Sequence, residues 1–183
     1  MAFRPEFKEA LGLLAKAAEV LVDQGLERPI LVGGAAVEFY TASAVTSGDF
    51  DLVTPSQSAF ENALESFGFV RIREPGMRIG GLIHPRLGLA VQVVSGQLMD
   101  GRTNKQKLLV VDMDGAALTI IPIEDLIADR VAQAHSVDPP RPDMIDQAVK
   151  LLQLSGPVDE AYLDRRIVEE SDGAANLEAL KRY

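Results

Sequence analysis

The chain has 183 residues, a formal net charge of −9, no cysteine, and a composition that is 47% hydrophobic and 25% charged. These values are typical of a globular protein and exclude a disordered or fibrous chain, and the length suits one substantial core with a small helical appendage. Without cysteine there is no disulfide and no thiolate metal site, so any metal must bind carboxylates, carbonyls or the two histidines.

The sequence predicts no membrane span, because it contains no run of about 18 apolar residues. Its first residues lack the charged and then apolar pattern of a secretory signal, so we expect a cytoplasmic location. The negative net charge disfavours nonspecific binding to nucleic acid. Residues 71–107 nevertheless hold seven basic residues and only two acidic ones. This basic stretch is either a phosphate-binding face or a solvated surface of strands and loops.

The first predicted elements alternate between helix and strand. Apolar residues at spacings of three and four predict a helix over 5–24. A short apolar run predicts a strand over 29–32, which ends at a glycine pair and leads into an alanine-rich helix over 33–40. A second strand is predicted over 50–53, and a Thr-Pro-Ser start followed by a terminal glycine predicts a helix over 54–68.

After residue 68 the apolar pattern becomes that of short strands and later returns to that of helices. The remaining strands of a mixed sheet are predicted at 69–73, 79–83, 88–94, 107–112 and 116–121. Asp114 and Gly115 form a two-residue hairpin signal between the last two strands. Helices are predicted at 123–135, 143–154 and about 158–171.

These elements predict an α/β fold with a short mixed sheet, flanking helices and a C-terminal helical segment. We expect an α/β core over residues 1–122. Residues 123–183 are expected to form a helical subdomain that packs on this core.

Asp49 and Asp51 lie two positions apart on a predicted strand, so both project from one face while Phe50 and Leu52 face the core. Two neighbouring carboxylates repel each other unless a cation lies between them. A magnesium or manganese ion held there neutralises the charge that develops in phosphoryl transfer. We therefore predict that Asp49 and Asp51 are catalytic metal ligands; the alternative is a solvated loop.

Gly33 and Gly34 lie between a predicted strand and a predicted helix. Glycine lets backbone amides approach a phosphate closely, and the N-terminus of the following helix favours negative charge. A tight turn without a ligand is the alternative. The order of the glycine pair, the helix and the two aspartates favours the interpretation as a phosphate site.

The segments 32–36 and 46–52 resemble the Gly-Gly and Asp-x-Asp-Leu signature of the nucleotidyltransferase superfamily. Within it, the likeness is to small bacterial proteins related to the AbiEii type toxins of toxin–antitoxin systems. Residues 122–130 and 143–146 are similar to a helical segment of that group. The resemblance covers about residues 28–154.

This resemblance implies a metal-dependent nucleotidyltransferase, which moves a nucleoside monophosphate from a nucleoside triphosphate to an acceptor hydroxyl on RNA, protein or a small molecule. It also implies an antitoxin or toxin partner. The residues that it places in the site are Asp49 and Asp51 on Mg²⁺ or Mn²⁺, Gly33, Gly34 and Ser47 on the nucleotide, and Arg130 as a further phosphate contact.

The sequence departs from the superfamily pattern at two places. The strand at 89–94 offers Gln92 where a third carboxylate is usual, and a neutral amide can bind magnesium but cannot act as a general base. Residues 40–48 lack an arginine that such proteins often carry. The alternative function is therefore a catalytically inactive relative that binds a nucleotide or a partner. Asp112 near the aspartate pair would favour the enzyme, and Gln92 alone would favour the binder.

Overall fold

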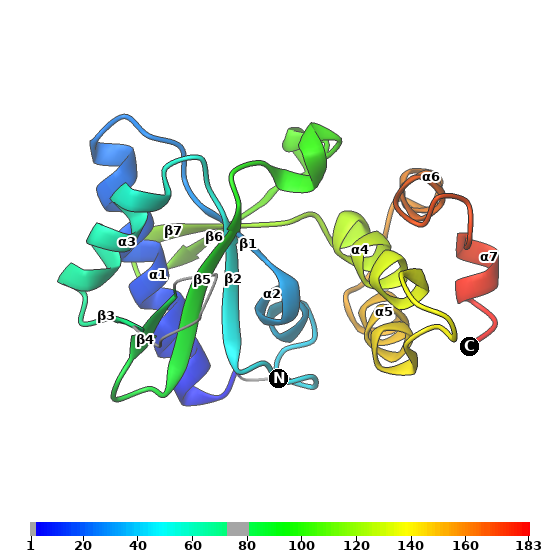
Figure 1. Cartoon of the computed structure of the whole chain (residues 1–183), viewed down its shortest axis with the longest axis horizontal. Helices are drawn as coiled ribbons and strands as arrows, with labels where there is room; N and C mark the ends of the chain where they lie inside the picture. The colour runs from blue at the N-terminus through cyan, green and yellow to red at the C-terminus, as the bar shows by residue number, and fades with distance from the viewer. Residues whose placement is uncertain (1–2, 73–80) are drawn as a thin grey trace. The chain divides into compact units, whose positions relative to one another are not determined.

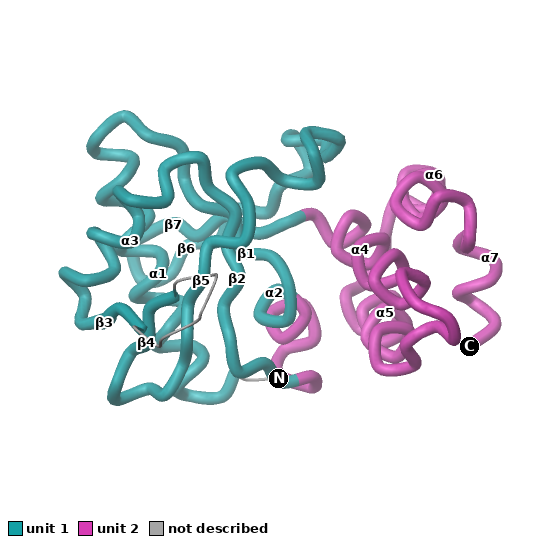
Figure 2. The backbone as a smooth tube through the Cα atoms, viewed as in Figure 1, with its two compact units in different colours: residues 1–36, 46–121 teal, residues 37–45, 122–183 magenta. Residues whose placement is uncertain are grey.

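The structure is a computed structural model, and it describes residues 3–72 and 81–183. The chain forms two compact units, which Figure 2 colours separately. Unit 1 comprises residues 1–36 and 46–121, and unit 2 comprises residues 37–45 and 122–183. The division near residue 121 lies beside the predicted boundary, but the segment 37–45 belongs to the helical unit. That this helical part packs on the core stays a prediction.

Unit 1 is built on a seven-stranded mixed sheet with the strand order β3-β4-β5-β2-β1-β7-β6. Its strands are β1 (Ile30–Val32), β2 (Asp49–Val53), β3 (Val70–Arg71), β4 (Leu82–His84), β5 (Leu89–Ser95), β6 (Leu109–Met113) and β7 (Ala116–Ile120). The pairs β2–β5 and β1–β7 are parallel, and the other pairs are antiparallel. The predicted α/β class with a mixed sheet is confirmed.

Helices α1 (Pro5–Asp23) and α3 (Gln57–Ser66) lie on one side of this sheet (Figure 1). The buried face of α1 includes Phe7, which stacks on Phe50 of β2 with 5.3 Å between the ring centroids. Leu52, two residues further along β2, is also fully buried. The strand therefore turns Phe50 and Leu52 into the core, as its alternating sequence predicts.

Some elements differ from the predicted ones. The expected strand over 107–112 begins only at Leu109, because residues 105–107 form a short 3₁₀ helix, η2. Asn104 caps this helix by accepting a hydrogen bond from the backbone N–H of Gln106 over 3.0 Å. A second 3₁₀ helix, η1 (Leu98–Gly101), was not predicted either. Residues 73, 79 and 80 of two expected strands lie outside the described residues.

Unit 2 contains helices α4 (Ile123–His135), α5 (Pro142–Leu154), α6 (Glu160–Glu170) and α7 (Leu177–Leu180). The first three match the predicted helices closely. Helix α2 (Gly33–Tyr40) begins in unit 1 and ends in unit 2. None of the helices in the described part of the chain combines the length and the apolar character that crossing a membrane requires.

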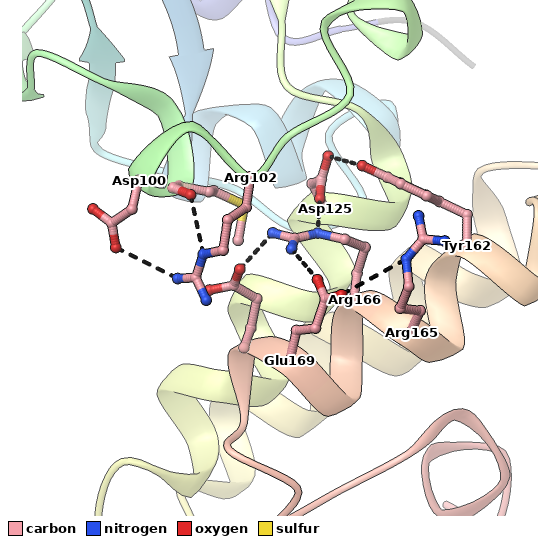
Figure 3. Close-up of polar contacts among 9 residues, drawn as sticks. Asp100, Arg102, Asp125, Tyr162, Arg165, Arg166 and Glu169 are labelled. Atoms are coloured by element: carbon pink, nitrogen blue, oxygen red, sulfur yellow. Dashed lines mark hydrogen bonds and ion pairs between the residues drawn. The ribbon is translucent and has the colours of Figure 1, made fainter.

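A buried ion-pair network joins α6 to α4 (Figure 3). Arg166 donates to Asp125 over 2.5 Å and to Glu169 over 2.6 Å, and Tyr162 donates its hydroxyl to Asp125 over 2.9 Å. Burial lowers the pKa of Arg166, but the hydrogen bonds to Asp125 and Glu169 outweigh it and raise the pKa above its ordinary value. The guanidinium therefore stays charged and holds the two helices together.

Candidate functional site

Asp49 and Asp51 lie on the face of β2 opposite the core. Burial along the strand alternates: Asp49 is exposed, Phe50 is buried, Asp51 is partly exposed and Leu52 is buried. The two carboxylates therefore project from the same face, as their spacing predicts. None of the described residues forms an ion pair with either of them, and Asp51 accepts a hydrogen bond from Gln92.

Gly33 lies directly against Asp51. The register of β1 and β2 places Val32 opposite Asp51, and Gly33 follows Val32 with a φ of +64°. A Cβ atom on Gly33 would overlap Asp51 Oδ2 and would approach its Cγ to 3.0 Å. Both the backbone conformation and the space therefore require glycine here. The glycine pair therefore lies beside the strand that carries the acid pair.

Gly34 lies against Ser47 in the loop that precedes β2. A Cβ atom on Gly34 would lie 2.8 Å from Ser47 Oγ. The Ser47 hydroxyl donates to the carbonyl oxygen of Asp49 over 2.9 Å, and it accepts from the Asp49 N–H over 3.4 Å. Ser47 thus fixes the entry to the strand beside the glycines, while its predicted contact with a nucleotide stays a prediction.

Arg4 brings a positive charge to this region that the sequence analysis does not predict. Its guanidinium donates to the carbonyl oxygen of Ser47 and lies 5.7 Å from the centroid of the Phe7 ring. The expected arginine is missing from residues 40–48, and Arg4 reaches the same loop from the N-terminal segment. No local pattern shows this, because the two residues are 43 positions apart.

Gln92 lies beside the acid pair, at the position where the resemblance leads us to expect a third carboxylate. Strand β5 runs parallel to β2 with Gln92 opposite Asp51, and Gln92 Nε2 donates to Asp51 Oδ1 over 2.6 Å. Among residues 3–72 and 81–183, no three acidic or histidine side chains gather where they could hold a metal ion. The site therefore has two acids and one amide.

Asp112 is too far away to replace the missing acid. It lies on β6, three strands from β2 in the sheet, which corresponds to about 14 Å at the usual strand spacing. Its carboxylate instead accepts a hydrogen bond from the N–H of Gly115, in a hairpin turn where Asp114 has a φ of +57°. This geometry fits the hairpin turn that the sequence predicts at Asp114 and Gly115.

Arg130 lies in unit 2, and its guanidinium has partners there. It donates to Asp129 over 2.5 Å and to Met144 Sδ over 3.7 Å, and its side chain is only 6% exposed. A phosphate would have to compete with these contacts. The role of Arg130 on the nucleotide stays a prediction.

The basic stretch at 71–107 is largely neutralised by carboxylates. Arg71 pairs with Glu61 and Glu65, Arg86 with Glu9, Arg102 with Asp100, and Lys105 with Glu27. The hydrogen bond from Arg86 lowers the pKa of Glu9. Arg73, Glu74 and Arg78 lie outside the described residues. These pairs favour the solvated surface over a phosphate-binding face.

The donors at the acid pair fit a single magnesium ion. Magnesium binds through one or two carboxylates together with substrate phosphates and waters, and it does not need a cage made only of protein. Asp49 and Asp51 supply the two carboxylates, and Gln92 can offer its amide oxygen if the side-chain amide turns over. Bound there, the ion would neutralise charge on the phosphates of a nucleotide.

No protein-family model matches the chain, and no curated sequence matches it. Several solved structures are similar to it. An antigenic nucleotidyltransferase-like protein from Paracoccidioides brasiliensis is similar at 17% identity and a TM-score of 0.65, over 98% of this chain and 94% of that one. ANT(2″)-Ia, solved in complex with adenylyl-2″-tobramycin, is similar at 15% identity and a TM-score of 0.59, over 91% of this chain and 99% of that one.

JHP933 from Helicobacter pylori is a further similar structure, at 11% identity and a TM-score of 0.55, over 92% of this chain and 80% of that one. The likeness to the nucleotidyltransferase-like protein and to ANT(2″)-Ia defines the class of fold: this chain has a nucleotidyltransferase-like fold. At these identities the likeness concerns the fold and not a substrate.

Proposed function

We propose that this chain is a metal-dependent nucleotidyltransferase that moves a nucleoside monophosphate from a nucleoside triphosphate to an acceptor hydroxyl. The observation that carries the proposal is the contact between Gly33 and Asp51, which brings a glycine-lined turn and a pair of carboxylates to one place. A phosphate and a divalent cation need these two features side by side.

Each group has a defined task in this proposal. Asp49 and Asp51 hold Mg²⁺ or Mn²⁺, which supplies charge neutralisation on the triphosphate. The backbone N–H groups of Gly33 and Gly34, at the start of α2, bind phosphate oxygens. Ser47 keeps the loop before β2 in place, and Arg4 lies beside that loop as a source of positive charge.

The amide of Gln92 lowers the expected rate without removing the reaction. A general base contributes about 10²- to 10⁴-fold, whereas phosphoryl transfer depends mostly on positioning and on electrostatic stabilisation. Asp49, Asp51, Gly33 and Gly34, which do the positioning in this proposal, all lie in unit 1. We therefore expect slow transfer, in which the acceptor oxygen bonds to the α-phosphorus, pyrophosphate leaves, and the hydroxyl proton goes to water or to a group on the acceptor.

A second candidate function is supported by the same amide. If Gln92 Nε2 keeps its hydrogen bond to Asp51 Oδ1 when nucleotide is bound, the chain binds a nucleotide or a partner and transfers nothing. This is the catalytically inactive relative that the missing carboxylate suggests from the sequence. Replacing Gln92 with glutamate separates the two functions.

The test is incubation with Mg²⁺ and each α-labelled nucleoside triphosphate, with RNA, protein and aminoglycoside acceptors in separate reactions. The aminoglycoside is included because ANT(2″)-Ia was solved with an adenylylated one. We expect label on one acceptor, and its loss in Asp49→Asn and Asp51→Asn. Transfer that survives both substitutions would contradict the mechanism, and tight nucleotide binding without transfer would support the inactive relative.

The resemblance to AbiEii type proteins leads to a finer proposal, in which the chain acts with an antitoxin or toxin partner in the cytoplasm. Expression of the chain alone should then arrest growth if it is the toxin, and Asp51→Asn should relieve that arrest. Unchanged growth with an active transferase would contradict a toxin role and leave the transfer reaction in place.

A further inference from the structure

Strand β6 forms one edge of the sheet in unit 1. Its only partner among the described strands is β7, and the strand order ends there. The opposite edge, β3, has two residues, whereas β6 has five, from Leu109 to Met113. Proteins usually protect an open edge with a bulge, a proline or a very short strand, because such an edge can pair with another chain. Strand β6 contains no proline, and its register with β7 has no bulge.

The backbone of β6 directs hydrogen-bonding groups out of the sheet at Val110 and Asp112. Asp112 lies opposite Ala117, whose N–H donates to Glu19 over 2.8 Å and so points away from β6. Opposite residues in an antiparallel pair either bond to each other or both point away, and the two kinds of pair alternate. The N–H and C=O groups of Asp112 and of Val110 therefore point outward. Within the described part of the chain, no other backbone group is bonded to them.

The side chains leave this edge open and give it one apolar face. Val110 is 59% exposed, and Asp112 beside it on the same face is also exposed. On the other face, Leu109 and Val111 are half-buried and Met113 is buried. These three lie opposite buried residues of β7. The apolar layer of unit 1 therefore continues as far as the edge strand.

We propose that β6 is a dimerisation edge, which pairs antiparallel with β6 of a second copy of this chain about a two-fold axis at Val111. In this register Val110 of one copy lies opposite Asp112 of the other, so their outward N–H and C=O groups bond to each other. Leu109 meets Met113 of the second copy, and Val111 meets Val111. The sheet and its apolar face then continue from one copy into the other.

The sequence of β6 favours this register over its neighbours. Pairing needs outward groups on both strands, so the alternatives are shifted by two residues. One shift places Asp112 opposite Asp112 of the second copy, and like charges opposite each other destabilise a strand pair. The other shift leaves Asp112 and Met113 beyond the end of the second β6. The proposed register pairs all of β6 and keeps the two Asp112 carboxylates apart.

The charges at the ends of β6 also complement each other in an antiparallel pair. The basic segment η2 (Lys105–Lys107) precedes the strand, and the acidic residues Asp112 and Asp114 lie at its far end. A second copy that runs antiparallel brings its basic end beside the acidic end of the first. The edge is therefore complementary to itself, which favours a second copy as the occupant over an unrelated strand.

We expect the dimer to be weak, because few residues take part. A standard interface uses about 20–30 residues from each partner, and β6 is much shorter than that. The inference does not depend on nucleotidyl transfer, because β6 lies three strands from β2 in the sheet. Loss of either result leaves the other in place.

The first test is sedimentation velocity of the full chain from micromolar to near-millimolar concentration, with amide hydrogen exchange of the ¹⁵N-labelled chain at both limits. We expect the mass to rise towards that of a dimer. The amides of Val110 and Asp112 should then exchange more slowly, whereas the amide of Val111, which points towards β7, should not change. A chain that stays monomeric, or a dimer that does not protect Val110 and Asp112, would overturn the proposal.

The second test uses two substitutions of opposite charge at Val110, whose exposure lets both variants fold. Val110→Lys faces Asp112 of the second copy and should tighten the dimer about 2- to 10-fold, whereas Val110→Glu should weaken it by a similar factor. High salt should reduce both effects. In an Asp112→Asn background the two variants should dimerise alike. Equal effects of lysine and glutamate with Asp112 present would contradict the register.

Discussion

Gln92 and Asp51 face each other across the parallel strands β5 and β2, and the amide of Gln92 donates to Asp51 Oδ1 over 2.6 Å. This hydrogen bond is attractive. A carboxylate at position 92 would instead repel Asp51 unless a cation lay between the two. The glutamine therefore stabilises Asp51 without metal, and a neutral amide cannot act as a general base.

Replacing Gln92 with glutamate should increase the rate of nucleotidyl transfer. The new carboxylate can accept the proton of the acceptor hydroxyl, and a general base contributes about 10²- to 10⁴-fold. The measurement is the single-turnover rate at saturating Mg²⁺ and nucleotide. Gln92→Met, which matches the length of glutamine and brings no charge, is the control and should show no gain.

The same variant should make folding depend on the metal. Two carboxylates at this distance repel each other, so Gln92→Glu should lower the melting temperature without Mg²⁺ and recover it when Mg²⁺ is added. If Gln92→Glu folds normally, binds nucleotide and still transfers nothing, the inactive relative is the better account of this chain.

Gly33→Ala should destabilise unit 1 and weaken nucleotide binding. The matched control is Gly88→Ala, because Gly88 has nearly the same φ, +66° against +64°, but no atom within 4 Å of the added Cβ. Gly88→Ala should cost about 1–2 kcal/mol from the backbone alone. Gly33→Ala should cost about 1–3 kcal/mol more, because its Cβ overlaps Asp51. Urea unfolding measures both, and equal losses would show that Gly33 and Asp51 are not in contact.

Arg166→Met should destabilise unit 2 strongly. Arg166 and Asp125 are both almost completely buried, and removing one partner of such a pair costs about 3–5 kcal/mol because the other charge is left buried alone. Arg165→Met is the control on the neighbouring position. Arg165 is 62% exposed and should contribute less than about 1 kcal/mol. Similar unfolding free energies for the two variants would contradict the network in Figure 3.

Glu19 should contribute to the loss of stability as the pH falls into the acidic range. The backbone N–H of Ala117 and then the guanidinium of Arg28 lower its pKa from the ordinary 4.5 in the folded chain. Ionised Glu19 therefore stabilises the fold above about pH 4.5, and this stabilisation is lost as the pH falls through the lower folded-state pKa. Glu19→Gln should flatten the profile in that window, as followed by thermal unfolding from pH 3 to pH 7.

Glu27→Gln serves as the control for this pH dependence. Glu27 is 71% exposed and 3.8 Å from Lys105, so its loss should leave the stability at acidic pH unchanged. If the wild type and Glu19→Gln lose the same stability at acidic pH, the hydrogen bonds from Ala117 and Arg28 to Glu19 do not form in solution.

The local geometry of the acid pair could be predicted from sequence because it depends on residues close together in the chain. Alternation along β2 places Asp49 and Asp51 on one face and Phe50 in the core, as period-two patterning requires. The mixed sheet and helices α4, α5 and α6 also follow from apolar spacing. These features use only short-range information.

Contacts between distant segments could not be predicted in this way. The bond from Arg4 to Ser47, the pairing of Gln92 with Asp51 and the ion pair of Asp125 with Arg166 each join residues about 40 positions apart. Asp125 lies in the first turn of α4, where acids are favoured, but it is fully buried with Arg166 as its partner. Such pairs depend on the tertiary fold, and local secondary-structure propensity does not predict them.

We propose that Asp49 and Asp51 hold a divalent cation next to the Gly33 turn. The most direct measurement is paramagnetic broadening by Mn²⁺ in the ¹⁵N-labelled chain, with each nucleoside triphosphate added in turn. We predict that the amide signals of Gly33, Gly34 and residues 49–51 broaden first, and that Asp49→Asn combined with Asp51→Asn removes the effect. Broadening that centres on other residues, or that is unchanged in the double variant, would contradict the account.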